Sequence, residues 1–319
     1  AAEERSAMLR VNVVLGFAML CYLLLENLSI YVLILAVKLF GLDVSYNHSD
    51  GALYGPEVAV LVILILQAIV KYLVPLLIFR KMFHMPRCVA FRIKPYVKRE
   101  IPITISIALI VFAITNLWTL FTPVNVLSFS TLGTAYYAVS YMSPPCQIIY
   151  LIAEVVIVSI MSELMLHGEI LHVLRQFGDW YAVLMTALLA VCVSHSYVTV
   201  MMEFTFAIVT GISVLRSGSL LSSIFSRMLY HVLLFAFFWL RIVPNIALSE
   251  HTFLLMLSLL LLGFLGCAAF MRTSKNDPAL LTQKHYLTPR ERMRTLIQTG
   301  PLSIIFGLCI ALMLIEVIF

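Results

Sequence analysis

Five titratable side chains lie within one contiguous third of the sequence, inside segments that are otherwise almost wholly apolar: Glu163, His167, His195, Arg227 and His231. A charged side chain at the centre of a bilayer costs about 3 kcal/mol even on the lenient insertion scale, so such residues usually face the interior of a helix bundle. Carboxylates and imidazoles move protons, and a guanidinium stabilises developing negative charge. The sequence therefore predicts a buried polar site with the groups for acid–base chemistry.

The spacing of these residues indicates how helices would bring them together. Glu163 and His167 are four residues apart, as are Arg227 and His231, so each pair shares one helix face. Counting back to the connecting turns at about 1.5 Å per residue places Glu163, His195 and His231 about 21–27 Å from the turns. The same arithmetic places His167 and Arg227 at about 15 Å. We therefore expect two layers built from three neighbouring helices.

The composition indicates the class of protein that supplies those helices. Of the 319 residues, 62% are hydrophobic and only 12% are charged, with a mean hydropathy of +1.03. Soluble domains are nearer half apolar and a quarter charged, so the sequence predicts a polytopic membrane protein surrounded by lipid. The net charge of +5 comes from two loops and does not indicate nucleic-acid binding. The six cysteines are scattered without CxxC or Cys/His metal spacing, which argues against structural zinc and a disulfide framework.

Apolar segments of spanning length predict an all-α transmembrane bundle. We identify about nine, near 11–39, 57–79, 101–122, 147–172, 180–196, 198–215, 219–240, 252–271 and 302–319. They divide the chain into an N-terminal part at 1–146 with about three spans, a core at 147–240 with about four, and a C-terminal part at 241–319. Residues 273–300 read as a linker with one short amphipathic helix.

The distribution of basic residues predicts the direction of insertion. Two connecting loops, 80–99 and 272–294, carry most of the lysine and arginine outside the spans. Cytoplasmic loops are enriched in these residues, so both loops are expected on the cytoplasmic side of a cell membrane. With nine crossings, the N-terminus is then cytoplasmic and the C-terminus lies outside.

Three segments around the polar residues resemble the motifs of the CPBP family of intramembrane endopeptidases, which includes the CAAX prenyl proteases and bacteriocin-processing proteins. The family's EExxxR motif corresponds to Ser162-Glu163-Leu164-Met165-Leu166-His167, followed by the family-like Glu169-Ile170-Leu171. Its FxxxH motif corresponds to Val191-Cys192-Val193-Ser194-His195, and HxxxN to Arg227-Met228-Leu229-Tyr230-His231. The resemblance covers about residues 160–235, and it implies a CAAX-protease-like core.

The resemblance also implies roles for individual residues, and it shows which of them have changed. In the family, the first glutamate and the second-motif histidine activate water, and the third motif stabilises the oxyanion. Ser162 stands at the first-glutamate position, where serine without an adjacent base cannot replace a carboxylate. Only Glu163 and His195 match the family's residues. His167 replaces arginine, and Arg227 and His231 replace histidine and asparagine.

The exchange of arginine and histidine between the first and third motifs has a physical interpretation. Arginine is absent from the first motif and present in the third, while histidine has done the reverse. Partners exchanged between helices would preserve a buried Arg–His–Glu hydrogen-bond network around Glu163. Such networks are costly when they are only half satisfied. The sequence therefore leads to the hypothesis of a buried Arg–His–Glu network, in which exchanging His167 and Arg227 is better tolerated than either single change.

Four functions are compatible with this sequence. The missing base favours a degenerate family member that acts as a membrane scaffold or regulator, binding another membrane protein or a membrane-associated peptide without cutting it. The alternative is an active endopeptidase for prenylated or leader peptides, with Glu163 as base and His195, Arg227 and His231 assisting. A metal-dependent protease would need zinc on ligands such as Glu163, His167, His195 and His231, although no HExxH signature is present and no cofactor is otherwise implied. A transporter is disfavoured because the sequence lacks repeats with broken helices.

Four further charged residues lie in or near apolar segments. These are Glu26, Lys71, Glu154 and Glu203. For them we favour helix packing or partner contacts over chemistry, because none belongs to the three motifs.

Overall fold

The computed structural model describes residues 2–47, 52–84, 86, 91, 93, 101–120, 142–194, 200–242, 248–273 and 287–318. Over these residues the fold is almost entirely α-helical, which confirms the predicted class. Each of the nine predicted apolar segments coincides with a helix in the described part of the chain. The helices are α1 Ala2–Leu39, α2 Glu57–Phe83, α4 Ile101–Leu120, a long helix Pro144–Phe177, α9 Asp179–Ser194, α10 Val200–Ser217, α11 Leu221–Ile242, α12 Leu248–Thr273 and α14 Gly300–Ile318.

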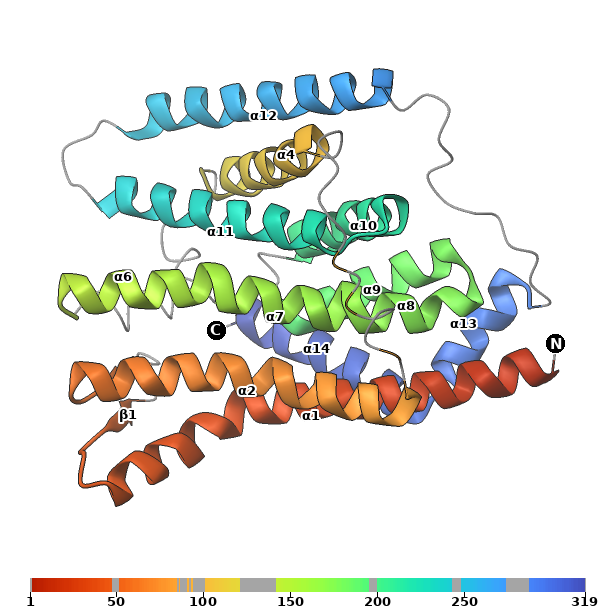
Figure 1. Cartoon of the computed structure of the whole chain (residues 1–319), viewed down its shortest axis with the longest axis horizontal. Helices are drawn as coiled ribbons and strands as arrows, with labels where there is room; N and C mark the ends of the chain where they lie inside the picture. The colour runs from red at the N-terminus through yellow and green to blue at the C-terminus, as the bar shows by residue number, and fades with distance from the viewer. Residues whose placement is uncertain are drawn as a thin grey trace.

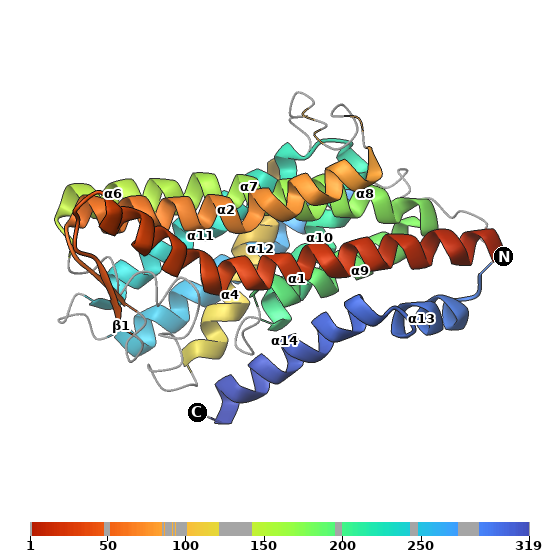
Figure 2. The same cartoon turned by 90° about the horizontal axis from the view of Figure 1, so that it is seen from below.

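The helices form a bundle in which most of them run along the longest axis of the molecule (Figures 1 and 2). In Figure 1, α12 lies at one side with α4 next to it, and α1 and α2 lie at the other side. The long helix Pro144–Phe177 runs between these groups beside α11. This central position puts its polar residues in the interior of the bundle. The predicted boundary between residues 146 and 147 falls within α6, Pro144–Ile152, the first segment of this helix.

Three helices in the described part of the chain are long and apolar enough to cross a membrane: α1, α2 and Pro144–Phe177. A fourth span is formed if α14 is counted together with the short helix that precedes it. Shorter apolar stretches lie at Pro102–Ile114, Asp179–Ser194 and Phe253–Ala269. The structure therefore supports a helical protein with three to four such helices, and the full set of nine crossings stays a prediction.

A small β-hairpin joins α1 to α2, where the sequence indicates only a polar loop. Strands β1, Ser45–Asn47, and β2, Ala52–Tyr54, pair antiparallel with Tyr46 opposite Leu53. Val44 and Leu53 are buried against the adjoining ends of α1 and α2. The hairpin thus covers the apolar end of this helix pair.

The long central helix is not uniformly α-helical. It contains two π-helical segments, η3 at Ala153–Val158 and η4 at Leu164–Ile170, with the short α7, Ser159–Glu163, between them. It then continues through α8, Leu171–Leu174, and ends in the 3₁₀ turn η5, Arg175–Phe177. Short π-helical turns inside α-helices occur frequently at functional sites, and here they flank the motif that contains Glu163.

The last helix, α14, packs closely against the first. Leu302, Ile305 and Cys309 are buried on its inner face. Gly16 of α1 makes this approach possible, because a Cβ atom there would lie 2.5 Å from the Leu302 backbone nitrogen. Small residues allow membrane helices to approach each other closely, since van der Waals packing drives their association.

We expect Gly16→Ala to lower the free energy of unfolding by about 1–3 kcal/mol, because the added methyl group would overlap the backbone of α14. Equilibrium unfolding in mixed micelles measures this change. The matched control is Gly307→Ala on α14, where an added Cβ meets no heavy atom within 4 Å. Equal stability of Gly16→Ala and the wild type would contradict this account of the α1–α14 contact.

The predicted amphipathic helix is present as α13, Pro289–Ile297. A capping box stabilises its first turn: the Thr288 hydroxyl accepts a hydrogen bond from the Glu291 backbone N–H, and the Glu291 carboxylate accepts one from the Thr288 backbone N–H. The chain then bends by 82° into α14. α13 therefore lies nearly at right angles to α14.

Candidate functional site

Glu163 and His167 lie on the central helix, at the end of α7 and within η4. Both side chains are completely buried. His167 Nδ1 lies 2.5 Å from Glu163 Oε2, a contact between residues four apart on one helix. The predicted shared face is therefore confirmed for this pair.

His167 also reaches the neighbouring helix α10. Its Nε2 atom lies 3.1 Å from the Ala207 carbonyl oxygen and 3.4 Å from Thr210 Oγ1. The Thr210 hydroxyl donates its own hydrogen to the Phe206 carbonyl at 2.7 Å, so its oxygen faces His167 as an acceptor. A neutral imidazole has only one N–H group, and here both ring nitrogens face acceptors.

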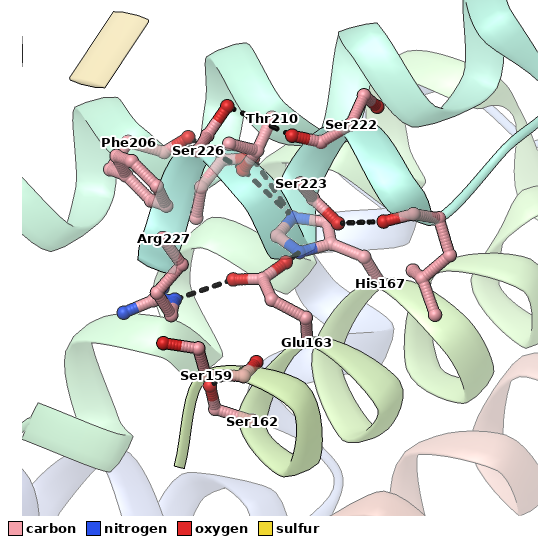
Figure 3. Close-up of polar contacts among 12 residues, drawn as sticks. Ser159, Ser162, Glu163, His167, Phe206, Thr210, Ser222, Ser223, Ser226 and Arg227 are labelled. Carbon is pink, nitrogen blue, oxygen red and sulfur yellow. Dashed lines mark hydrogen bonds and ion pairs between the residues drawn. The ribbon is translucent and has the colours of Figure 1, made fainter. Parts of the chain in front are cut away.

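Arg227 of α11 completes the contacts of Glu163. Its Nε atom donates to Glu163 Oε1 at 2.5 Å. Figure 3 shows Glu163 between Arg227 on one side and His167 on the other. The predicted Arg–His–Glu network is therefore present in the structure, with one Glu163 oxygen in contact with each partner.

Glu203 of α10 is a fourth member of this cluster. Arg227 donates to both Glu203 oxygens, from Nη1 at 3.3 Å and from Nη2 at 3.1 Å. The guanidinium also lies 4.8 Å from the centre of the Phe206 ring. Arg227 thus pairs with carboxylates on two helices, which lowers the cost of burying them. The cluster joins three helices: the central helix, α10 and α11.

His231 and Ser162 contribute to the site differently from the prediction. His231 is buried, and its Nδ1 atom lies 3.4 Å from Ser159 Oγ, one helical turn before Glu163. The Ser162 hydroxyl donates to the Ser159 carbonyl of its own helix at 3.2 Å. This arrangement corrects the two layers expected from the sequence. Glu163 was expected in one layer, but it pairs with His167 and Arg227, the two residues expected in the other. The π-helical turns around α7 alter the positions that uniform α-helical arithmetic assigns.

His195, the predicted histidine of the second motif, lies outside the described residues, which end at Ser194 in this segment. Among the residues that the structure describes, no group of three or more His, Cys, Asp and Glu side chains is arranged to hold a metal ion. Within the network, both Glu163 oxygens already contact Arg227 and His167. A zinc site on these ligands would require that network to open.

Glu203 is expected from the sequence in packing or partner contacts, and the structure gives it a specific partner inside the site, Arg227. The sequence contains a sign of this pairing. Arg227 is a single deep arginine that needs more than one acceptor, and Glu203 lies on the helix before it. Glu26 and Lys71 form a separate ion pair between α1 and α2, with Lys71 Nζ 3.0 Å from Glu26 Oε1. Glu154 instead accepts a hydrogen bond from Tyr150 at 3.4 Å.

Comparison with protein families, with curated proteins and with solved structures found no match to this chain. The arrangement of the site is therefore interpreted from its own contacts. Its chemical capacity follows from them: it holds charge inside the bundle, and the Glu163 carboxylate is enclosed between Arg227 and His167.

Proposed function

We propose that this chain is an integral membrane protein in which the Glu163 network joins helices and does not hydrolyse peptides, so that it acts as a scaffold or regulator for another membrane protein or a membrane-associated peptide. In this proposal it is a degenerate member of the CPBP group of intramembrane endopeptidases. It lies in a cell membrane with the N-terminus and the two basic loops on the cytoplasmic side and the C-terminus outside.

One observation carries this proposal: Glu163 is completely buried, and its two carboxylate oxygens contact Arg227 Nε and His167 Nδ1, each at 2.5 Å. A general base must lie within hydrogen-bond reach of the proton it removes, directly or through one water molecule. A carboxylate held by Arg227 and His167 is positioned to stabilise charge on its neighbours instead. The adjacent Ser162 offers no second base, because its hydroxyl is engaged with the backbone of its own helix.

Peptidase activity tests the proposal directly. The purified full chain, Glu163→Gln and Ser162→Glu are each incubated with a prenylated peptide and with a leader-type peptide, and products are measured by mass spectrometry. We expect no turnover by the wild type. Turnover that disappears in Glu163→Gln would overturn the scaffold proposal and favour the alternative endopeptidase.

Ser162→Glu is expected to produce cleavage if the site is a protease that lost its activity mainly at this position. The physical reason is that the substitution restores a carboxylate next to Glu163, where the resembling family has its first glutamate. Ser162→Gln is the matched control, because it has similar size without a base. Cleavage by the glutamine variant would contradict a role for the restored carboxylate.

A further inference from the structure

The short helix α13 is fastened to the rest of the protein along one face. Thr295 and Leu296 are buried there. Arg292 donates to the Phe177 carbonyl at 2.8 Å and lies 3.9 Å from the Glu4 carboxylate. These contacts connect α13 to the last turn of the central helix and to the start of α1. Its orientation on the bundle is therefore fixed.

The opposite face of α13 carries two basic and two apolar side chains that are all exposed: Arg290, Met293, Arg294 and Ile297. Their positions i, i+3, i+4 and i+7 place them on one stripe of the helix, here called the α13 stripe. Met293 is 58% exposed and Ile297 is 66% exposed. Basic side chains near an anionic membrane surface are attracted to it, and long arginine side chains can reach headgroups while neighbouring apolar side chains enter the interface.

The direction of α13 agrees with such a position. Its axis turns by 82° relative to α14, so it lies close to the plane of the membrane if α14 crosses it. The outer face of α14 is apolar, with Ile304, Leu308 and Ile315 exposed. α13 also lies at the same end of the bundle as the start of α1, where Arg5 is hydrogen-bonded to Gln298 at 2.8 Å. A third basic side chain thus lies beside the α13 stripe.

We propose that the α13 stripe binds the headgroups of anionic phospholipids in the leaflet on the N-terminal side of the protein. Arg290 and Arg294 contact lipid phosphates, while Met293 and Ile297 enter the boundary between headgroups and acyl chains. The exposed carboxylate on this helix, Glu291, is held in the capping box at the first turn. The inference rests on the proposed placement in a membrane, but it is independent of whether the chain is a scaffold or an enzyme.

Melting of the full chain in lipid nanodiscs tests this inference. We expect the melting temperature in phosphatidylglycerol nanodiscs to exceed that in phosphatidylcholine nanodiscs by about 4 °C, because basic residues near an anionic surface each contribute attraction. Arg290→Gln/Arg294→Gln should lose at least half of this difference while melting like the wild type in phosphatidylcholine. The charge-matched control is Arg10→Gln/Arg272→Gln, which removes two exposed arginines outside the α13 stripe.

Two results would overturn the inference. One is a lipid-dependent difference that is the same in Arg290→Gln/Arg294→Gln as in the wild type. The other is an equal loss in the Arg10→Gln/Arg272→Gln control, which would indicate general charge attraction.

Hydrogen exchange of residues 288–298 provides a local measurement that does not depend on global melting. Greater protection in phosphatidylglycerol, absent from the Arg290→Gln/Arg294→Gln variant and not reproduced by inorganic phosphate, is the expected result. Identical protection in the two lipids would contradict it.

Discussion

Replacing Arg227 with leucine is expected to lower the free energy of unfolding by about 3–5 kcal/mol, because the change leaves buried carboxylates without their common cation. Arg227 donates to Glu163 at 2.5 Å and to both oxygens of Glu203. Leucine keeps most of the apolar contact but none of these hydrogen bonds. Equilibrium unfolding of the purified chain in mixed micelles measures the difference.

The matched control for this prediction is Arg272→Leu, an exposed arginine at the end of α12. The Arg272→Leu substitution should change the free energy of unfolding by no more than about 0.5 kcal/mol. Glu203→Gln in the Arg227→Leu background should recover part of the loss, because it removes one of the unpaired charges. If Arg227→Leu is as stable as Arg272→Leu, the network does not hold the helices together.

The second prediction concerns exchange of the two cationic partners of Glu163. His167→Arg and Arg227→His are each expected to lower the free energy of unfolding by about 3 kcal/mol or more, because each alters one side of a buried charge network. The double variant should be more stable than either single variant, since Glu163 again lies between one arginine and one imidazole. Coupling of about 1–2 kcal/mol between the two positions is expected for residues in one network.

The structure adds a limit to this exchange that the sequence does not reveal. Glu203 receives two hydrogen bonds from Arg227, and a histidine at position 227 is too short to replace both. The double variant should therefore remain less stable than the wild type, and adding Glu203→Gln should improve it. Equal damage from His167→Arg, Arg227→His and their combination would contradict exchange of partners.

The helical class and the positions of the helices could be predicted because long apolar segments separated by charged loops leave few alternatives. The contacts of Glu163 with His167 and Arg227 also followed from residue type and spacing, since a buried carboxylate needs nearby donors. These predictions depend on local pattern and on the cost of burying charge. Local pattern and the cost of burying charge can both be judged from one amino-acid sequence.

Other features could not be predicted because they depend on packing between segments distant in sequence. The π-helical turns around α7 shift residues relative to a uniform helix, so His231 contacts Ser159 at 3.4 Å instead of joining Glu163. Glu203 has no motif around it, and only the approach of α10 to α11 shows which cation it binds. The β-hairpin depends on backbone pairing across a short loop whose side chains show no clear alternation.

The close contact between Gly16 and Leu302 has a consequence for how the protein is made. The surface of α1 around Gly16 leaves the ribosome long before Leu302 is synthesised, because more than half of the sequence separates the two residues. At about 5–20 residues per second, tens of seconds pass before α14 exists. During that interval the surface of α1 around Gly16 lacks its native neighbour, and this contact of the bundle can form only when α14 displaces whatever apolar group covers it.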